Sequence, residues 1–220
     1  TYWWADQRQP GSKWDYIFGN LDIIGFVIIN PRSGFGDKVE PDFTDLTTEL
    51  KKKNVPGVGY VRTIKGTRST DEVLAEIRKY QEAYHLEGVF LDEMINGWSE
   101  AEAALIDQYK KLYQDIKAEF GKGFLVVGNP GTNTKPEMLE CADILMSFEK
   151  KATQYLNDTD APVTPDHYRA ESPLRFVHAI HNLESTDQLR QVLEKAEKSN
   201  VAFFYATDDT FSGVEGSENE

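Results

Sequence analysis

Carboxylic acids follow two of the apolar segments in this sequence. Asp92 and Glu93 come directly after residues 88–91, and Glu149 comes directly after residues 144–148. Cleavage of a glycosidic bond requires two carboxyl groups, one to protonate the leaving oxygen and one to attack or to activate water. Neighbours along a strand point to opposite faces, so Asp92 and Glu93 cannot easily act on one bond, and Glu149 is the available partner. A single acid at such a place could instead cap the next helix.

Polar or aromatic side chains also lie at the ends of the other apolar segments, and they suit contacts with sugar hydroxyls. The candidates for substrate binding are Asn30, Tyr60, Arg62, Asn129, His178, Tyr205 and Asp208, together with Trp98 and the tryptophans at positions 3 and 4. The plainer alternatives are that Asn-Pro pairs form turns and that a lone histidine or Trp98 is packed. No cluster of residues has metal-ligand spacing, and no phosphate loop is present, so no metal or cofactor is expected.

The elements that must position these residues alternate between apolar runs and amphipathic stretches. Ser69 and Ser99 supply N-cap signals, and Asn54 and Gly121 supply C-cap signals. Eight runs read as buried strands, at residues 2–4, 23–29, 57–61, 88–91, 124–127, 144–148, 174–177 and 201–205; the helical stretches are residues 42–53, 70–84, 99–120 and 187–199. This alternation predicts an α/β fold, a single (β/α)8 TIM-type barrel over residues 1–220 with a loose acidic tail after about residue 209. A doubly wound open sheet is the rival architecture.

The composition of the chain limits the classes of partner that it is expected to bind. The chain of 220 residues carries a net charge of −13, which repels phosphate backbones and argues against nucleic acid. No apolar stretch approaches the ~18 residues of a membrane span. The single cysteine, Cys141, cannot form an internal disulfide. The first residue is Thr1, which suggests that a targeting segment has been removed.

Four sequence blocks, in this order, resemble the spherulin-4 family. They are INPRSG at residues 29–34, VGYVRT at 58–63, GVFLDE at 88–93, and Ala142-Asp143 followed by Phe148-Glu149. Residues 2–4 and 205–209 fit the first and last strands of that family. Trp3-Trp4 and Arg32 depart from its usual pattern, and these departures bear on the identity of the substrate more than on the reaction.

The resemblance implies a (β/α)8 barrel with an acidic cleft that cleaves α-1,4-linked N-acetylgalactosamine-containing exopolysaccharide. The family's acidic trio corresponds to Asp92, Glu93 and Glu149. We expect an endo-acting, retaining enzyme with Glu149 as the acid/base and Asp92 as the nucleophile, although these two roles are interchangeable at this point. We also expect a monomer that is extracellular or bound at the cell surface. The alternative is a non-catalytic carbohydrate-binding or sporulation-associated structural protein on the same scaffold.

Overall fold

A computed structural model of the chain describes residues 12–157 and 164–210. The strands are β1 (Val27–Ile29), β2 (Gly57–Arg62), β3 (Gly88–Asp92), β4 (Leu125–Gly128), β5 (Ile144–Lys151), β6 (Phe176–His181) and β7 (Phe203–Ala206). The helices are α1 (Lys13–Gly19), α2 (Pro41–Lys52), α3 (Thr70–Tyr84), α4 (Glu100–Ala103), α5 (Ile106–Phe120), α6 (Ala152–Leu156), α7 (Asp166–Arg169) and α8 (Thr186–Glu197). Short 3-10 helices cover Leu21–Ile23, Ile64–Gly66, Pro136–Glu140 and Pro173–Arg175.

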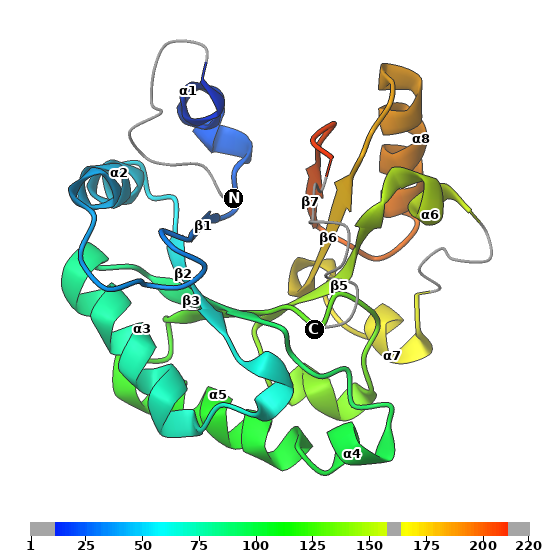
Figure 1. Ribbon diagram of the computed structural model, residues 1–220. Coiled ribbons are helices and arrows are strands. Elements are labelled where there is room, and N and C mark those ends of the chain that lie inside the picture. Colours follow the sequence, from blue (N-terminus) through cyan, green and yellow to red (C-terminus); the bar gives the residue numbers. More distant parts are fainter. Residues whose placement is uncertain (1–11, 158–163, 211–220) are drawn as a thin grey trace.

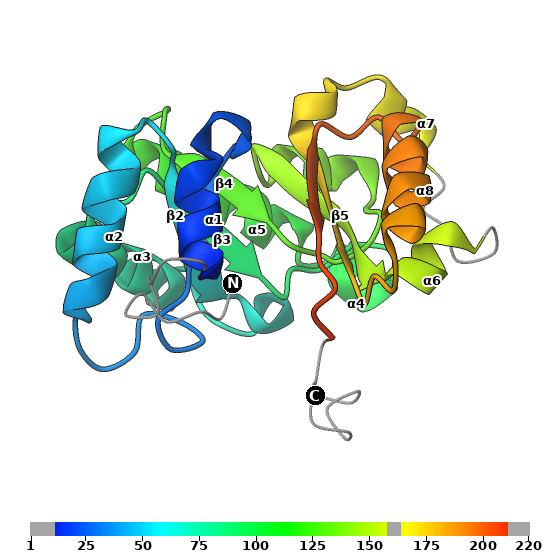
Figure 2. The same ribbon diagram turned by 90° about the horizontal axis from the view of Figure 1, so that it is seen from above.

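The strands form one parallel sheet in the order β1-β2-β3-β4-β5-β6-β7. Figure 1 shows this sheet as a curved half-barrel with α3 and α5 on its outer side. Seen from above, α2 and α3 lie beside one half of the sheet, and α6 and α8 lie beside the other half (Figure 2). All strands run the same way, so their carboxyl ends share one rim.

The prediction of a closed eight-stranded barrel is wrong. Within the described residues the sheet has seven strands, and no ladder joins its edges, β1 and β7. β1 is only three residues long because the apolar run at 23–29 begins as the 3-10 helix Leu21–Ile23. Near the two edges, the rings of Phe26 and Phe203 pack edge to face with centroids 5.6 Å apart, which is a contact between side chains and not backbone pairing. The expected strand at residues 2–4 and most of the predicted acidic tail, residues 211–220, lie outside the described residues.

The predicted helices form where local signals specify them. α3 begins with a capping box in which Ser69 Oγ accepts from Glu72 N and Glu72 Oε2 accepts from Ser69 N. The stretch at residues 99–120 is not one helix: α4 ends after Ala103, where Leu105 N donates to Glu102 O, and α5 starts at Ile106. α1, α6 and α7 are short helices that the periodicity did not indicate.

Alternate residues of each strand pack in different layers. The concave face of the sheet is lined by Val58, Tyr60, Phe90, Val127, Ile144, Met146 and Val177. The opposite face packs against the helices through residues such as Val61, Leu91, Val126 and Leu145. Gly59 allows α3 to approach closely, because a Cβ there would lie 2.7 Å from the ring of Tyr80. A side chain that continues the concave set toward the carboxyl ends therefore emerges at the open rim.

Candidate active site

Three adjacent strands bring Asp92, Asn129 and Glu149 together. Leu91 of β3 pairs with Gly128 of β4, so Asp92 and Asn129, the residues that follow them, stand side by side. Asp92 follows Phe90, and Asn129 follows Val127, at a spacing of two. Both side chains therefore continue the concave face, because strand residues two apart share a side.

Glu149 reaches the same face because β5 contains a β-bulge. The pairing of β5 with β6 runs from Met146 opposite Val177 to Phe148 opposite His178, so Ser147 is an extra residue. Strict alternation from the inward Met146 would point Glu149 away from the concave face. The extra residue reverses that parity, as bulges do. Phe148 then packs on the outer side, and Glu149 turns inward.

One amide nitrogen hydrogen-bonds both carboxyl groups. Asn129 Nδ2 donates to Asp92 Oδ1 at 2.8 Å and to Glu149 Oε2 at 2.7 Å. These two oxygen atoms are therefore at most about 5.5 Å apart, the two distances laid end to end. Asn129 Oδ1 accepts from Gly131 N at 2.8 Å, and Glu149 N donates to Gly131 O at 3.2 Å. The asparagine thus forms the turn expected of an Asn-Pro pair and also joins the two acids.

Tyr60 completes the hydrogen bonding of Asp92. Its hydroxyl donates a hydrogen bond to Asp92 Oδ2. Its ring stacks on Phe90 with centroids 6.0 Å apart, which fixes the hydroxyl over the end of β3. Both oxygens of Asp92 are then held, one by Tyr60 and one by Asn129, so the carboxyl group has a defined orientation.

The environment of Glu149 favours its protonated form. Burial raises the pKa of Glu149, and the negative charge of nearby Asp92 raises it further. The hydrogen bond from Asn129 and the proximity of His181 act in the opposite direction without cancelling the increase. Two carboxyl groups of unlike environment, one of them with a raised pKa, are the arrangement that acid-assisted bond cleavage requires.

Glu93 is bound to Arg62 at the rim. Arg62 donates to Glu93 Oε1 from Nη2 at 2.7 Å and from Nε at 3.0 Å. This hydrogen bond raises the pKa of the Arg62 guanidinium. Glu93 has a left-handed backbone with φ of 54°, and its carbonyl accepts from Lys65 N at 2.8 Å. The side chain therefore leaves the strand direction and ties the loop after β3 to the loop after β2.

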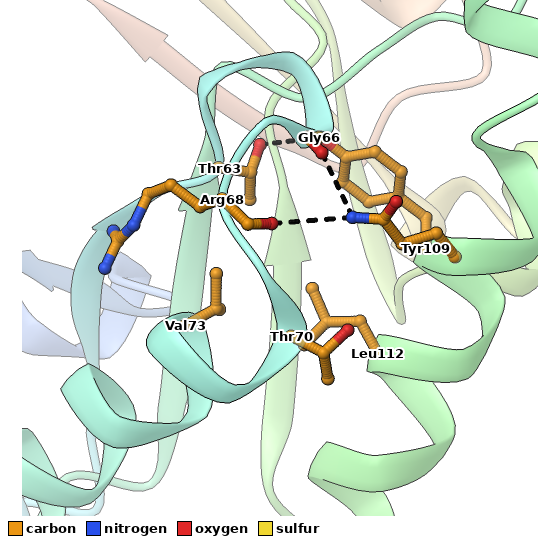
Figure 3. A pocket seen from close by; sticks show the side chains of 8 residues that line it. Thr63, Gly66, Arg68, Thr70, Val73, Tyr109 and Leu112 are labelled. Carbon is orange, nitrogen blue, oxygen red and sulfur yellow. Dashed lines mark hydrogen bonds between the residues drawn. The ribbon is translucent and has the colours of Figure 1, made fainter.

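Thr63 holds the backbone on which the two adjacent acids stand. Its hydroxyl lies 2.9 Å from the carbonyl oxygens of both Asp92 and Glu93, and 2.7 Å from Tyr109 Oη. Figure 3 shows Thr63 and Tyr109 on the wall of a small cavity between the β2–α3 loop and α5. Gln108 Nε2 donates to Gly66 O at 3.1 Å in the same place. The Thr63–Tyr109 and Gln108–Gly66 contacts tie the loop after β2 to α5, and neither Asp92 nor Glu149 lines this cavity.

Other predicted residues are placed differently. His178 is buried on the outer face, where Nδ1 contacts Tyr155 Oη at 2.9 Å and Nε2 contacts Ser147 Oγ at 3.1 Å. Its burial lowers its pKa to about 4. This placement corrects the expectation that His178 touches substrate. Asn30 is also buried, and its Oδ1 accepts from Gly34 N at 2.9 Å, as a turn former does.

Aromatic and acidic residues remain exposed at or near the rim. Trp98 is 55% exposed, and its Nε1 donates to Asn133 O at 3.0 Å, which fixes the indole while leaving much of its surface open. Tyr205 of β7 pairs with Ala179, the same residue that pairs with Glu149, so all three share a level on the concave face. Asp208 is exposed after β7. Trp3 and Trp4 lie outside the described residues.

His181 lies near the candidate carboxyl pair, and the sequence analysis did not single it out. The predicted strand ended at residue 177, which made His178 the first residue beyond it. β6 instead runs from Phe176 to His181. Residues 177, 179 and 181 are two apart along β6, so all three point to the concave side. His181 therefore lies near Glu149, and it lowers the pKa of Glu149. Extending the strand and counting in steps of two would have found it.

Two absences apply to the described part of the chain. Residues 12–157 and 164–210 contain no group of three or more His, Cys, Asp or Glu side chains that could hold a metal ion. Over the same ranges, no helix has the length and apolar character needed to cross a membrane.

Comparisons with known proteins agree with this architecture. The model of a family described as spherulation-specific family 4 matches residues 2–217. Spherulin-4 of Physarum polycephalum is 32% identical over 154 residues, which are 68% of this chain and 44% of that protein. The chain therefore spans less than half the length of this relative.

Two solved structures share the fold. Sph3 of Aspergillus clavatus, determined in complex with GalNAc, has a TM-score of 0.75 and 21% identity, covering 94% of this chain and 87% of that one. A chitinase from Rhizomucor miehei has a TM-score of 0.59 and 11% identity, covering 85% of this chain and 89% of that one. At these identities the likeness is one of fold.

Proposed function

Since the chain belongs to spherulation-specific family 4, we propose that it is a glycoside hydrolase whose two working carboxyl groups are Asp92 and Glu149. The observation that carries this proposal is the single amide nitrogen of Asn129 bonded to both. Two acids that serve only as helix caps would not converge on one donor. The shared fold with Sph3 and with a chitinase supports the same class of reaction.

The separation of the two acids favours a retaining mechanism. Retaining enzymes hold their carboxyl groups about 5–5.5 Å apart, and inverting enzymes hold them about 6.5–9.5 Å apart to admit a water molecule. The Asp92 and Glu149 oxygens that share Asn129 Nδ2 are at most about 5.5 Å apart, which is closer than the inverting range. Asp92 would attack the anomeric carbon directly.

Glu149 is the proposed proton donor because burial raises its pKa. Its proton passes to the glycosidic oxygen as the bond to the anomeric carbon breaks, and an oxygen of Asp92 bonds to that carbon. Water then attacks the glycosyl–Asp92 ester, Glu149 takes the proton of that water, and the sugar leaves with its original configuration. Tyr60 and Asn129 orient Asp92 throughout, while Glu93 and Arg62 brace the rim.

The proposed substrate is an α-1,4-linked exopolysaccharide containing N-acetylgalactosamine and galactosamine, cleaved internally. Two observations support it: Sph3 was determined in complex with GalNAc, and the net charge of −13 attracts the ammonium groups of unacetylated units. Trp98 and Tyr205 offer exposed aromatic surface for pyranose rings. Because such a polymer lies outside cells, the proposal implies an extracellular or cell-surface protein.

The test is turnover of defined polymers. The protein is incubated with partially de-N-acetylated α-1,4-polygalactosamine, with its fully acetylated form, and with chitin oligosaccharides as the alternative sugar. Released oligosaccharides are identified by mass spectrometry, and the first anomer formed is identified by proton NMR. We expect cleavage of an N-acetylgalactosamine polymer with retention of configuration.

Variants assign the roles. Asp92→Asn and Glu149→Gln are expected to abolish turnover, whereas Asp187→Asn, which changes an exposed acid on α8, leaves turnover intact. Full activity in either of the first two variants would refute the assignment. Binding of the polymer by the native protein without any product would replace the hydrolase with a carbohydrate-binding protein.

A further inference from the structure

The β-bulge that turns Glu149 inward is backed by a buried polar chain. Ser147, the extra residue of β5, contacts His178 Nε2 through its hydroxyl at 3.1 Å, and His178 Nδ1 contacts Tyr155 Oη at 2.9 Å. Ser147 and His178 are each 2% exposed, and Tyr155 is fully buried. The three residues come from β5, β6 and α6 respectively, and these elements lie beside one another in Figure 1.

We propose that His178 is a positioning residue that, through its hydrogen bond to Ser147, holds the bulge and so directs Glu149 into the concave face. The inference rests on the proposed function, since it names Glu149 as the working acid. A bulged residue drops out of the regular ladder, so its position depends on side-chain partners. Without the bulge, the two-residue alternation would send Phe148 inward and Glu149 outward.

Aromatic packing holds the same register. The ring of Phe148 lies between Tyr155, with centroids 4.8 Å apart, and His178, with centroids 5.8 Å apart. The rings of Tyr155 and His178 are themselves 5.5 Å apart. These contacts keep Phe148 in the outer layer, which is the position it can occupy only while Ser147 remains bulged.

A neutral imidazole fits between the two hydroxyl groups. In its neutral form one ring nitrogen donates and the other accepts, and a hydroxyl can take either role. Burial keeps the ring neutral by lowering the pKa of His178. The histidine thus joins β5 to α6 without placing a positive charge in the layer beneath Glu149.

The first measurement is steady-state kinetics on the polymer. Ser147→Ala and His178→Phe each remove the proposed contact, and His178→Phe keeps an aromatic ring of similar size. We expect each variant to lower kcat by about 2- to 12-fold, the value of one neutral hydrogen bond, with KM unchanged. The double variant should lose no more than either single variant. His178→Gln, whose amide can reach Ser147, should recover much of the loss.

The control is Tyr113→Phe on α5, which removes the 2.8 Å hydrogen bond from the tyrosine hydroxyl to Asp143, the residue before the amino end of β5. It should lower stability and leave kcat unchanged. If the folded Ser147→Ala and His178→Phe variants also lose stability while keeping the wild-type kcat, the inference is overturned, because His178 would then be structural only.

The second measurement needs no catalysis. Carboxyl carbon NMR follows the titration of Glu149 in the wild-type protein and in Ser147→Ala. Weakening of the bulge should move the Glu149 pKa part of the way back toward its ordinary value, because the side chain then spends part of its time outside its buried position. An unchanged titration would overturn the inference. If the wild-type protein cleaves no polymer, the proposed function fails, and this titration still decides whether Ser147 and His178 direct Glu149.

Discussion

Replacing Asn129 with leucine removes the amide that donates to both carboxyl groups while keeping a side chain of similar size. Each lost contact is a hydrogen bond to an acid, and such bonds are worth about 1.5–3 kcal/mol. Asp92 and Glu149 each keep some contact with solvent, so water replaces part of the loss. We therefore expect the two lost contacts together to cost the free energy of one such hydrogen bond. This free energy corresponds to a decrease of about 10- to 150-fold in kcat.

The same substitution has a second, independent consequence. The hydrogen bond from Asn129 lowers the pKa of Glu149, against the larger effect of burial. Without it, the pKa of Glu149 rises further. A proton donor with a higher pKa stays protonated to higher pH, so the alkaline limb of the kcat/KM profile should move upward in Asn129→Leu.

The assay is kcat and KM on the polymer across pH, with folding checked by circular dichroism. Thr134→Val is the matched control: it lies buried in the same loop and loses its hydroxyl contact with Tyr168 of 2.9 Å, which involves no acid. Its kcat and pH profile should stay near those of the wild type. A folded Asn129→Leu protein with kcat within about twofold of wild type and an unmoved alkaline limb would refute the reasoning.

Three further outcomes are expected. Trp98→Ala should raise KM for the polymer by about 2- to 12-fold with little change in kcat, since an aromatic contact worth about 0.5–1.5 kcal/mol is lost; a changed kcat with constant KM would contradict a binding role. Glu149→Gln should become progressively more stable than the wild type as pH rises, because a buried acid with a raised pKa destabilises the fold once pH passes the ordinary carboxyl range. Urea unfolding at pH 4 and pH 7 measures this, and a constant difference would count against it. Gly59→Ala should lower the free energy of unfolding by about 1–3 kcal/mol, because its Cβ would press on the ring of Tyr80; thermal melting tests this, and an unchanged Tm would show that α3 moves aside freely.

The alternation of strands and helices could be predicted because its signals are local. Apolar runs such as residues 57–61 and 88–91 are found as β2 and β3, and the capping residues Ser69 and Ser99 begin helices where they were expected to. Short elements without strong periodicity, such as α6 and α7, were not predicted. The closed barrel was wrong because closure depends on whether the two edge strands pair, which the pattern within each strand does not encode.

The sequence by itself determined that acids stand at the ends of two buried strands, and that an asparagine follows the strand between them. Only the tertiary structure decided which way these side chains point. The direction of Glu149 depends on the bulge at Ser147. Which histidine, His178 or His181, stands at the carboxyl end of β6 depends on where that strand ends. Both are set by pairing and packing between segments distant along the chain, and residue order alone does not specify them.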